Sequence, residues 1–222
     1  MGRIEDLDRA AAAAAGSAPD AAAALASIDW LAESLEADRA AGLFSRWGRA
    51  TALDPRTGEA LLRQPLFEAL HDRAGLDATW PIGNAGLLQT YGSLLSTATA
   101  ADARAGGDRE RWLGTELATG LGLAGTHFVP WQGSGTLLAR ATEAASVLLA
   151  SGGEFSWYSL AEGRATRAVL SHEHGGSRTL AYAVAPAPGT SPLLVALLPV
   201  AQAETVRRDL DEAAARLRWN AA

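Results

Sequence analysis

The hydrophobic pattern of the chain changes period at Gly152-Gly153, and this change constrains the fold more than any single motif does. Before these glycines apolar residues recur at helical spacing, whereas after them they follow the period of strands. A run of helices followed by a run of strands is typical of an α+β fold. We therefore expect one α+β domain over residues 17–222, with a helical part at 17–153 and a sheet-plus-helix part at 154–222.

The second part predicts a four-stranded antiparallel sheet closed by a C-terminal helix. Gly-containing links at 161–163 and 175–177 favour hairpins. The continuous apolar run at 193–200 is typical of a central strand buried on both faces, and residues 201–218 carry apolar side chains at helical spacing. The expected strands are 155–160, 164–174, 178–185 and 193–200.

The first part predicts helices separated by Gly- and Pro-rich turns. Ser17 precedes Pro19 and Asp20, a combination that favours a helix start, and Ser134 is the expected N-cap of another helix. Residues 87–97 fit a strand or a helix equally well. The expected helices are 17–41, 43–47, two pieces separated by Pro65 of which the second is 65–74, 109–119 and 135–150. Residues 127–131 are expected to be extended, and residues 1–16 are expected to form a flexible leader that is either disordered or loosely helical.

The chain contains no lysine, and its nineteen basic side chains are all arginine. Without a lysine amine, the chain cannot form the imine that holds pyridoxal phosphate. It also has no cysteine, which excludes thiol nucleophiles, disulfides and thiolate-bound metals. We therefore expect no cofactor, and we expect any chemistry to depend on carboxylates, imidazoles, hydroxyls and guanidinium groups.

The charge distribution argues against nucleic-acid and membrane partners. The net charge is -6 and the arginines are scattered, whereas nucleic-acid binding depends on clustered positive charge. The strongly apolar run 193–200 is far shorter than the roughly 20 residues of a membrane-spanning helix. The N-terminal sequence carries Glu5, Asp6 and Asp8 and lacks the pattern of a signal peptide, which predicts a cytoplasmic protein. The sequence leaves open whether copies of the chain form a homo-oligomer.

Aromatic and polar side chains concentrate in and beside the irregular segments of residues 80–131. Trp112 and Glu116 are four residues apart on an expected helix and therefore share a face. An arginine at 109 or 111 is suited to hold a ligand carboxylate with two parallel hydrogen bonds. The alternative is that the tryptophans are core residues and the arginines are solvated. The expected ligand-binding residues are Trp80, Asn84, Tyr91, Arg109, Arg111, Trp112 and Trp131, and the expected acid–base pair is Glu116 and His127.

A second candidate is the His172-Glu173-His174 sequence. Alternate residues of a strand point to the same face, so the imidazoles of His172 and His174 would form a pair of metal ligands. A metal needs further ligands, and His71 and His127 are among the distant donors in the sequence. The alternative is that this pair is solvated at the tip of a hairpin.

Four segments resemble parts of small actinobacterial proteins catalogued as amino acid deaminases. They are WPIGNAGLL at 80–88, TYG and LLST within 90–97, RERW at 109–112 and LRWNA at 217–221, together 25 of the 222 residues. The resemblance implies kinship with that group. In its members a Pro-Tyr-Gly-Leu-Lys stretch precedes the RERW segment, whereas residues 98–108 here contain neither Tyr nor Lys. Pyridoxal-dependent deamination would therefore lack its amine in this chain.

We therefore expect a small-molecule-binding protein for an amino-acid-like or other carboxylate ligand, and leave open whether it is an enzyme of the lyase or deaminase type. Catalysis would be cofactor-free acid–base chemistry. The rival hypothesis is a non-enzymatic interaction module that docks a partner through its acidic N-terminal helix, with Trp30 as the anchor. A metal site at His172 and His174 is the third hypothesis.

Overall fold

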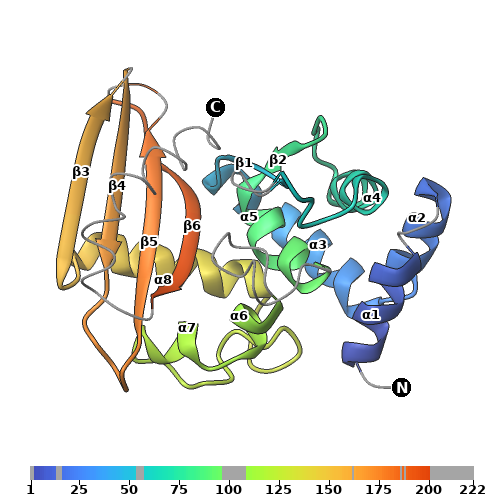
Figure 1. Cartoon of the computed structure of the whole chain (residues 1–222), viewed down its shortest axis with the longest axis horizontal. Coiled ribbons are helices and arrows are strands. Elements are labelled where there is room, and N and C mark those ends of the chain that lie inside the picture. Colours follow the sequence, from blue (N-terminus) through green and yellow to red (C-terminus); the bar gives the residue numbers. More distant parts are fainter. Residues whose placement is uncertain are drawn as a thin grey trace.

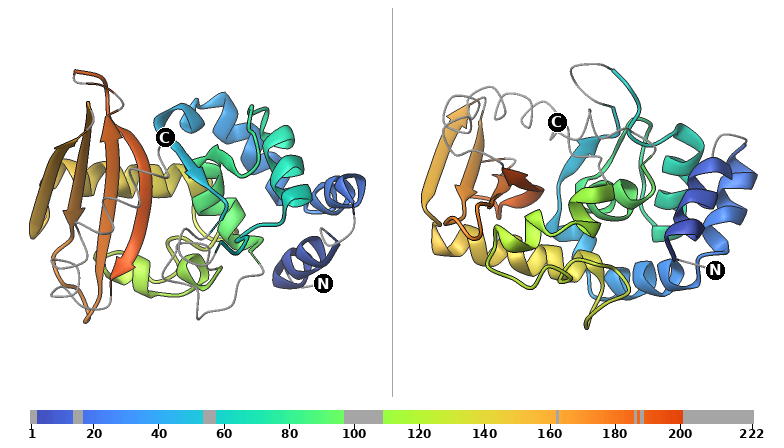
Figure 2. Two further views of the ribbon diagram at one scale, coloured as in Figure 1. Left: turned by 45° about the horizontal axis from the view of Figure 1, so that its top comes forward. Right: turned by 60° about the horizontal axis from the view of Figure 1, so that its bottom comes forward.

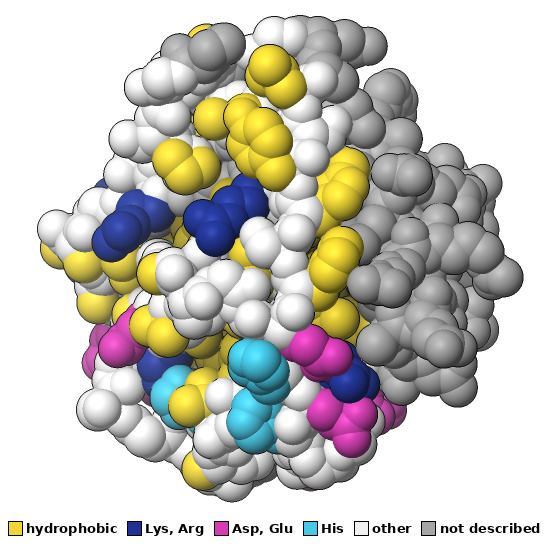
Figure 3. All heavy atoms as spheres, turned by 90° about the vertical axis from the view of Figure 1, so that its left-hand side faces the viewer, with side chains coloured by type: hydrophobic (Ala, Val, Ile, Leu, Met, Phe, Trp, Pro, Cys, Tyr) yellow, Lys and Arg dark blue, Asp and Glu magenta, His cyan; other side chains and the backbone are white. Residues whose placement is uncertain are grey.

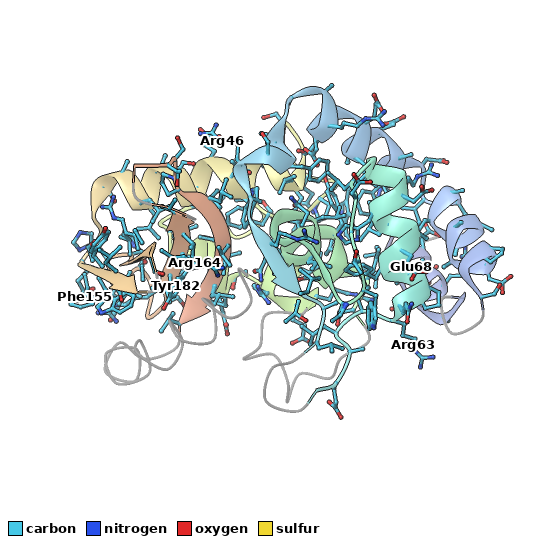
Figure 4. The ribbon with its side chains drawn as sticks, turned by 90° about the horizontal axis from the view of Figure 1, so that it is seen from above. Arg46, Arg63, Glu68, Phe155, Arg164 and Tyr182 are labelled. Atoms are coloured by element: carbon cyan, nitrogen blue, oxygen red, sulfur yellow. The ribbon has the colours of Figure 1, made fainter. Side chains whose placement is uncertain are left out.

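A computed structural model gives the structure of the chain and describes residues 3–13, 17–53, 58–96, 109–161, 163–185, 187 and 189–200. The antiparallel sheet forms one side of the molecule and the helices form the other, while α8 (Leu137–Ser151) runs along the sheet towards them (Figures 1 and 2). Figure 4 shows the same division, with Phe155 and Tyr182 at the sheet and Arg63 and Glu68 at α4 (Gln64–Ala74). The α+β class is therefore confirmed.

The four-stranded antiparallel sheet is confirmed, but the apolar run 193–200 forms a strand at the edge of this sheet and not the central strand that was expected. Its strands β3 (Phe155–Ala161), β4 (Arg164–Leu170), β5 (Arg178–Ala185) and β6 (Leu193–Val200) pair antiparallel in the order β3-β4-β5-β6. Strand β4 ends four residues earlier than expected. The backbone N–H of Thr179 donates to the hydroxyl of Ser171 at 2.9 Å. The Ser171 side chain therefore accepts the hydrogen bond that a main-chain carbonyl accepts in a regular pair of strands.

The two faces of the sheet belong to two hydrophobic clusters. Val169, Ala181 and Leu197 lie opposite one another on adjacent strands and join the main core, where α8 packs. The row of Ala168, Tyr182 and Ala196 points to the other face and forms a smaller cluster with Phe155, Trp157, Leu180 and Leu198. The helix expected at 201–218 lies outside the described residues.

The N-terminal residues depart from the expected leader and single helix. Residues 3–13 form α1 (Arg3–Ala13), because Leu7 and Ala10 give it a small apolar face that is fully buried in the main core. The helix expected at 17–41 is divided into α2 (Ala18–Ala26) and α3 (Asp29–Ala40). At the break, Ile28 leaves the helical conformation (φ -102, ψ 87) and buries its side chain in the core. A 3-10 turn, η1 (Leu43–Arg46), follows as expected.

The middle of the chain contains a small sheet that the sequence did not predict. Strands β1 (Arg49–Thr51) and β2 (Ile82–Asn84) pair antiparallel, and each is too short to show a period-2 pattern. Helix α4 occupies the second piece expected after Pro65, whereas residues 58–63 are not helical. Residues 87–94 are helical, through α5 (Ala85–Leu87) and the π-turn η2 (Leu88–Gly92).

The segment before α8 also differs from the prediction. The helix expected at 109–119 is divided into α6 (Arg109–Leu113) and α7 (Glu116–Thr119), and residues 127–131 form turns instead of an extended segment. Helix α8 begins after Thr136 rather than Ser134, because the Thr136 hydroxyl accepts the N–H of Ala139 at 3.0 Å. Within the described residues, no helix is long and apolar enough to cross a membrane.

Candidate functional site

Two of the expected pocket residues are buried in the core. Trp112 is 0% exposed, its ring packs edge-on against Phe128, and its indole N–H donates to the carbonyl of Gln89. Tyr91 is 1% exposed and donates its hydroxyl to Asp38 at 2.6 Å. Because their polar groups are satisfied within the fold, these side chains account for packing and not for ligand recognition.

The remaining aromatic and amide residues lie at separate places. Trp80 packs edge-on against Phe67 of α4, and Trp131 packs against Trp30 of α3 at a centroid distance of 5.9 Å. Trp30, which the interaction hypothesis used as an anchor, is thus half-buried against another ring. The Asn84 amide accepts the N–H of Leu87 and donates to the carbonyl of Phe44, both at 3.0 Å.

The expected charged residues also have partners within the fold or lie on the surface. Arg109 forms an ion pair with Asp8 and donates to the carbonyl of Leu94 at 2.7 Å. Arg111 is buried and donates to the side-chain oxygen of Gln89 at 2.8 Å. Glu116 is exposed in the first turn of α7. The structure therefore does not bring these residues together with His127.

His127 instead lines a pocket of about 280 Å³ with His172 and His174, so three of the four histidines of the chain meet there. We call it the three-histidine pocket. Figure 3 shows a group of imidazoles on this face, with hydrophobic side chains and both signs of charge around it. Its polar lining includes Arg140 and Glu143, and its apolar walls are Leu121, Leu123, Ala144, Val147 and Leu148.

Helix α8 supplies one wall of the three-histidine pocket through residues at helical spacing. Arg140, Glu143, Val147 and Ser151 are separated by three or four positions and all line the pocket. None of these four residues was predicted from the sequence as part of a site. Their spacing is visible in the sequence. It indicates a pocket only because the loop that carries His172 and His174 lies on the other side of the same cavity.

The opposite wall comes from the loop that follows β4. His172 and His174 are both exposed and lie beyond the end of that strand, so they are not strand residues as expected. The Nδ1 atom of His174 lies 3.1 Å from the carbonyl oxygen of His172, which favours the tautomer with Nδ1 protonated and leaves Nε2 free to accept. A Cβ atom on Gly122 would lie only 3.1 Å from this Nε2 atom, so a glycine there leaves room for the ring.

Arg140 holds the segment that presents His127. Its guanidinium and Nε groups donate to the backbone carbonyls of residues 127, 129, 130, 132 and 136. Arg140 is only 6% exposed, and no carboxylate among the described residues forms an ion pair with it. Among the described residues, its buried positive charge is thus compensated by carbonyl dipoles and not by an ion pair.

The electrostatics of His127 follow from this arrangement. Burial lowers the pKa of His127, the Arg140 charge lowers it further, and Glu143 acts in the opposite direction. His127 is thus neutral at pH 7 and able to accept a proton. On the nearby rim, Arg178 pairs with Glu154 at 2.9 Å and with Glu173 at 2.7 Å.

Within the described residues, no group of three His, Asp or Glu side chains is arranged to hold a metal ion. The three imidazoles line one pocket without forming such a group. No protein-family model, curated protein or solved structure matches the chain. The three-histidine pocket is therefore interpreted from its own geometry and charge.

Proposed function

We propose that the protein binds a small organic acid with an apolar body in the three-histidine pocket. The observation that carries the proposal is the combination of Arg140, a buried cation without an ion-pair partner among the described residues, and three imidazoles around one apolar pocket. Burying a charge is costly unless an opposite charge compensates for it. A ligand carboxylate near Arg140 and His127 supplies that compensation, while its hydrocarbon part packs against Leu121, Leu123 and Val147.

Binding of an acid is expected to be linked to proton uptake at His127. The Arg140 charge and burial keep His127 neutral in the free protein. A carboxylate in the pocket stabilises the imidazolium form and so raises the pKa of His127 towards neutral pH. Glu143 acts in the same direction, whereas Glu154 and Glu173 share a single cation, Arg178, which compensates for one of their two negative charges.

The reaction class that fits these groups is cofactor-free proton transfer. His127 is the proton acceptor, as the sequence analysis expected, and Glu143 takes the place of Glu116 as the neighbouring carboxylate. The basis for this step is the neutral state of His127, whose ring lines the pocket and makes no hydrogen bond with the described residues.

The test is calorimetry at pH 7 with a panel of monocarboxylates, such as benzoate, phenylacetate and 4-methylpentanoate, each paired with its primary amide. At least one acid is expected to bind with a Kd below about 1 mM and at least about tenfold more tightly than its amide. Repeating the titration in buffers of different ionisation enthalpy measures proton uptake, which His127→Gln should remove.

Two further variants separate the pocket from a general effect of charge. Ala144→Leu fills the pocket without changing its charge and should abolish binding. Arg46→Gln removes an exposed cation on η1, which Figure 4 shows pointing away from the molecule, and should leave binding unchanged. If no acid in the panel binds more tightly than its amide, the proposal is wrong.

A further inference from the structure

A second pocket, of about 320 Å³, lies where β6 meets the small β1–β2 sheet. Its polar lining consists of Arg49, Asp77 and Asn84. The apolar lining consists of Trp47, Leu76, Val184, Leu193 and Val195. We call it the β6-edge pocket. It shares no lining residue with the three-histidine pocket.

The fold builds this pocket by pairing the edge of β6 with a short loop segment. The N–H of Gly48 donates to the carbonyl of Leu194 at 2.8 Å, and Trp47 forms a parallel bridge with the same residue. The carbonyl of Gly48 then accepts the N–H of Ala85, also at 2.8 Å. Gly48 is therefore bonded on both sides, and the pocket floor is fixed by the backbone.

Most of the polar groups near this floor are already satisfied. The indole N–H of Trp47 donates to the hydroxyl of Thr142 at 2.9 Å, so its ring offers only apolar surface. The Asn84 amide bonds to Phe44 and Leu87. Recognition of a polar ligand therefore depends on Arg49 and Asp77.

Arg49 and Asp77 carry opposite charges, line the same pocket and do not form an ion pair with each other. Both are exposed, and neither has an ion-pair partner among the described residues. Within the described residues, the Arg49 guanidinium makes one long hydrogen bond, of 3.4 Å, to the carbonyl of Ile82. Two opposite charges that line one apolar pocket without forming an ion pair match a ligand that carries both charges itself.

We infer that the β6-edge pocket binds a small zwitterion with an apolar side chain, of the size of an aliphatic amino acid. Arg49 pairs with its anionic group and Asp77 with its cationic group. The hydrocarbon part lies on Trp47, Val184 and Val195. This site is independent of the organic-acid site proposed above.

The experiment compares three probes of the same shape: leucine, leucinamide, which lacks the anionic group, and 4-methylpentanoate, which lacks the cationic group. Titrations are made in the full chain carrying Ala144→Leu, which fills the three-histidine pocket, so that an organic acid bound there does not contribute. Leucine is expected to bind at least about tenfold more tightly than either analogue.

Two charge variants assign each end of the ligand. Arg49→Gln should remove the preference for leucine over leucinamide and keep its preference over 4-methylpentanoate. Asp77→Asn should do the reverse. Equal affinity for all three probes, no measurable binding of leucine at millimolar concentration, or a charge variant that leaves both preferences intact would overturn the inference.

Gly48 offers a steric test with a matched control. A Cβ atom there would lie 3.5 Å from the Cβ of Leu193 and 3.7 Å from Val195, which is ordinary contact. Gly48→Ala is therefore expected to fold and to bind leucine, whereas Gly48→Leu fills the pocket and should abolish binding. A thermal melt checks that both variants are folded. Unchanged leucine binding by folded Gly48→Leu would place the zwitterion elsewhere and reject the site.

Discussion

Asp38 is a fully buried carboxyl group that has only hydroxyl partners among the described residues. Tyr91 donates to one carboxylate oxygen and Thr136 to the other. Thr136 is also the N-cap of α8, and its carbonyl accepts from Arg140 at 3.3 Å. Through Thr136, Asp38 thus connects α3 to Arg140, which holds the backbone beside the three-histidine pocket. Burial raises its pKa to about 6, although both hydroxyl bonds act to lower it.

This raised pKa predicts a specific dependence of stability on pH. Between the ordinary value of 3.8 and the folded value of about 6, the folded state keeps a proton that the unfolded state has lost. The contribution of Asp38 to the unfolding free energy therefore falls as pH rises from 4 to 6 and does not change further above pH 6. At 1.36 kcal/mol per pKa unit, the total fall is about 3 kcal/mol.

Asp38→Asn should remove this fall, as measured by urea unfolding at several pH values. Tyr91→Phe keeps the carboxyl but removes a hydrogen bond that favours its charged form, so the fall should extend to higher pH. If the unfolding free energies of the natural chain and of Asp38→Asn changed with pH in the same way, the fall could not be due to the Asp38 carboxyl.

At the scale of elements, β2 is held in place by a side chain of α4. His71 donates from Nδ1 to the carbonyl of Phe67 at 2.8 Å and accepts the N–H of Asn84 on Nε2 at 3.1 Å. Burial lowers the pKa of His71, and Arg49 adds to the effect, so the ring stays neutral in this bridge. Such short strands depend on tertiary contacts and not on local pattern, which is why the sequence did not predict them.

Gly83 shows how closely this contact is packed. A Cβ atom at Gly83 would lie 2.2 Å from Nε2 of His71 and 2.9 Å from Phe67. Gly83→Ala should therefore lower the unfolding free energy by about 1–3 kcal/mol, the usual cost of overpacking. His71→Ala relieves the clash, so the double variant should be more stable than the sum of the single changes predicts. Additive losses in a double-mutant cycle would show that the contact is not tight.

At the scale of the whole molecule, α8 joins the helices to the sheet. One continuous core extends from Leu7 in α1 through Leu138 in α8 to Leu197 in β6. The sequence predicted the elements of this arrangement because α8 and the strands have long, regular patterns. It did not predict the site, because the three-histidine pocket depends on α8 packing beside the loop of His172 and His174. His127 was the only predicted acid–base residue found there.

A main core that the helices and the sheet share predicts a single cooperative unfolding unit. Leu138 is 0% exposed, so Leu138→Ala should lower the unfolding free energy by about 2–5 kcal/mol. Hydrogen exchange should show an equal decrease for the most protected amides of α4 and of β5, since both belong to the same unit. Val147→Ala on the same helix is the matched control. Its side chain is 62% exposed, so the change should stay within about 0.5 kcal/mol. If Leu138→Ala weakened protection in β5 alone, the helices and the sheet would be separate folding units despite their shared helix.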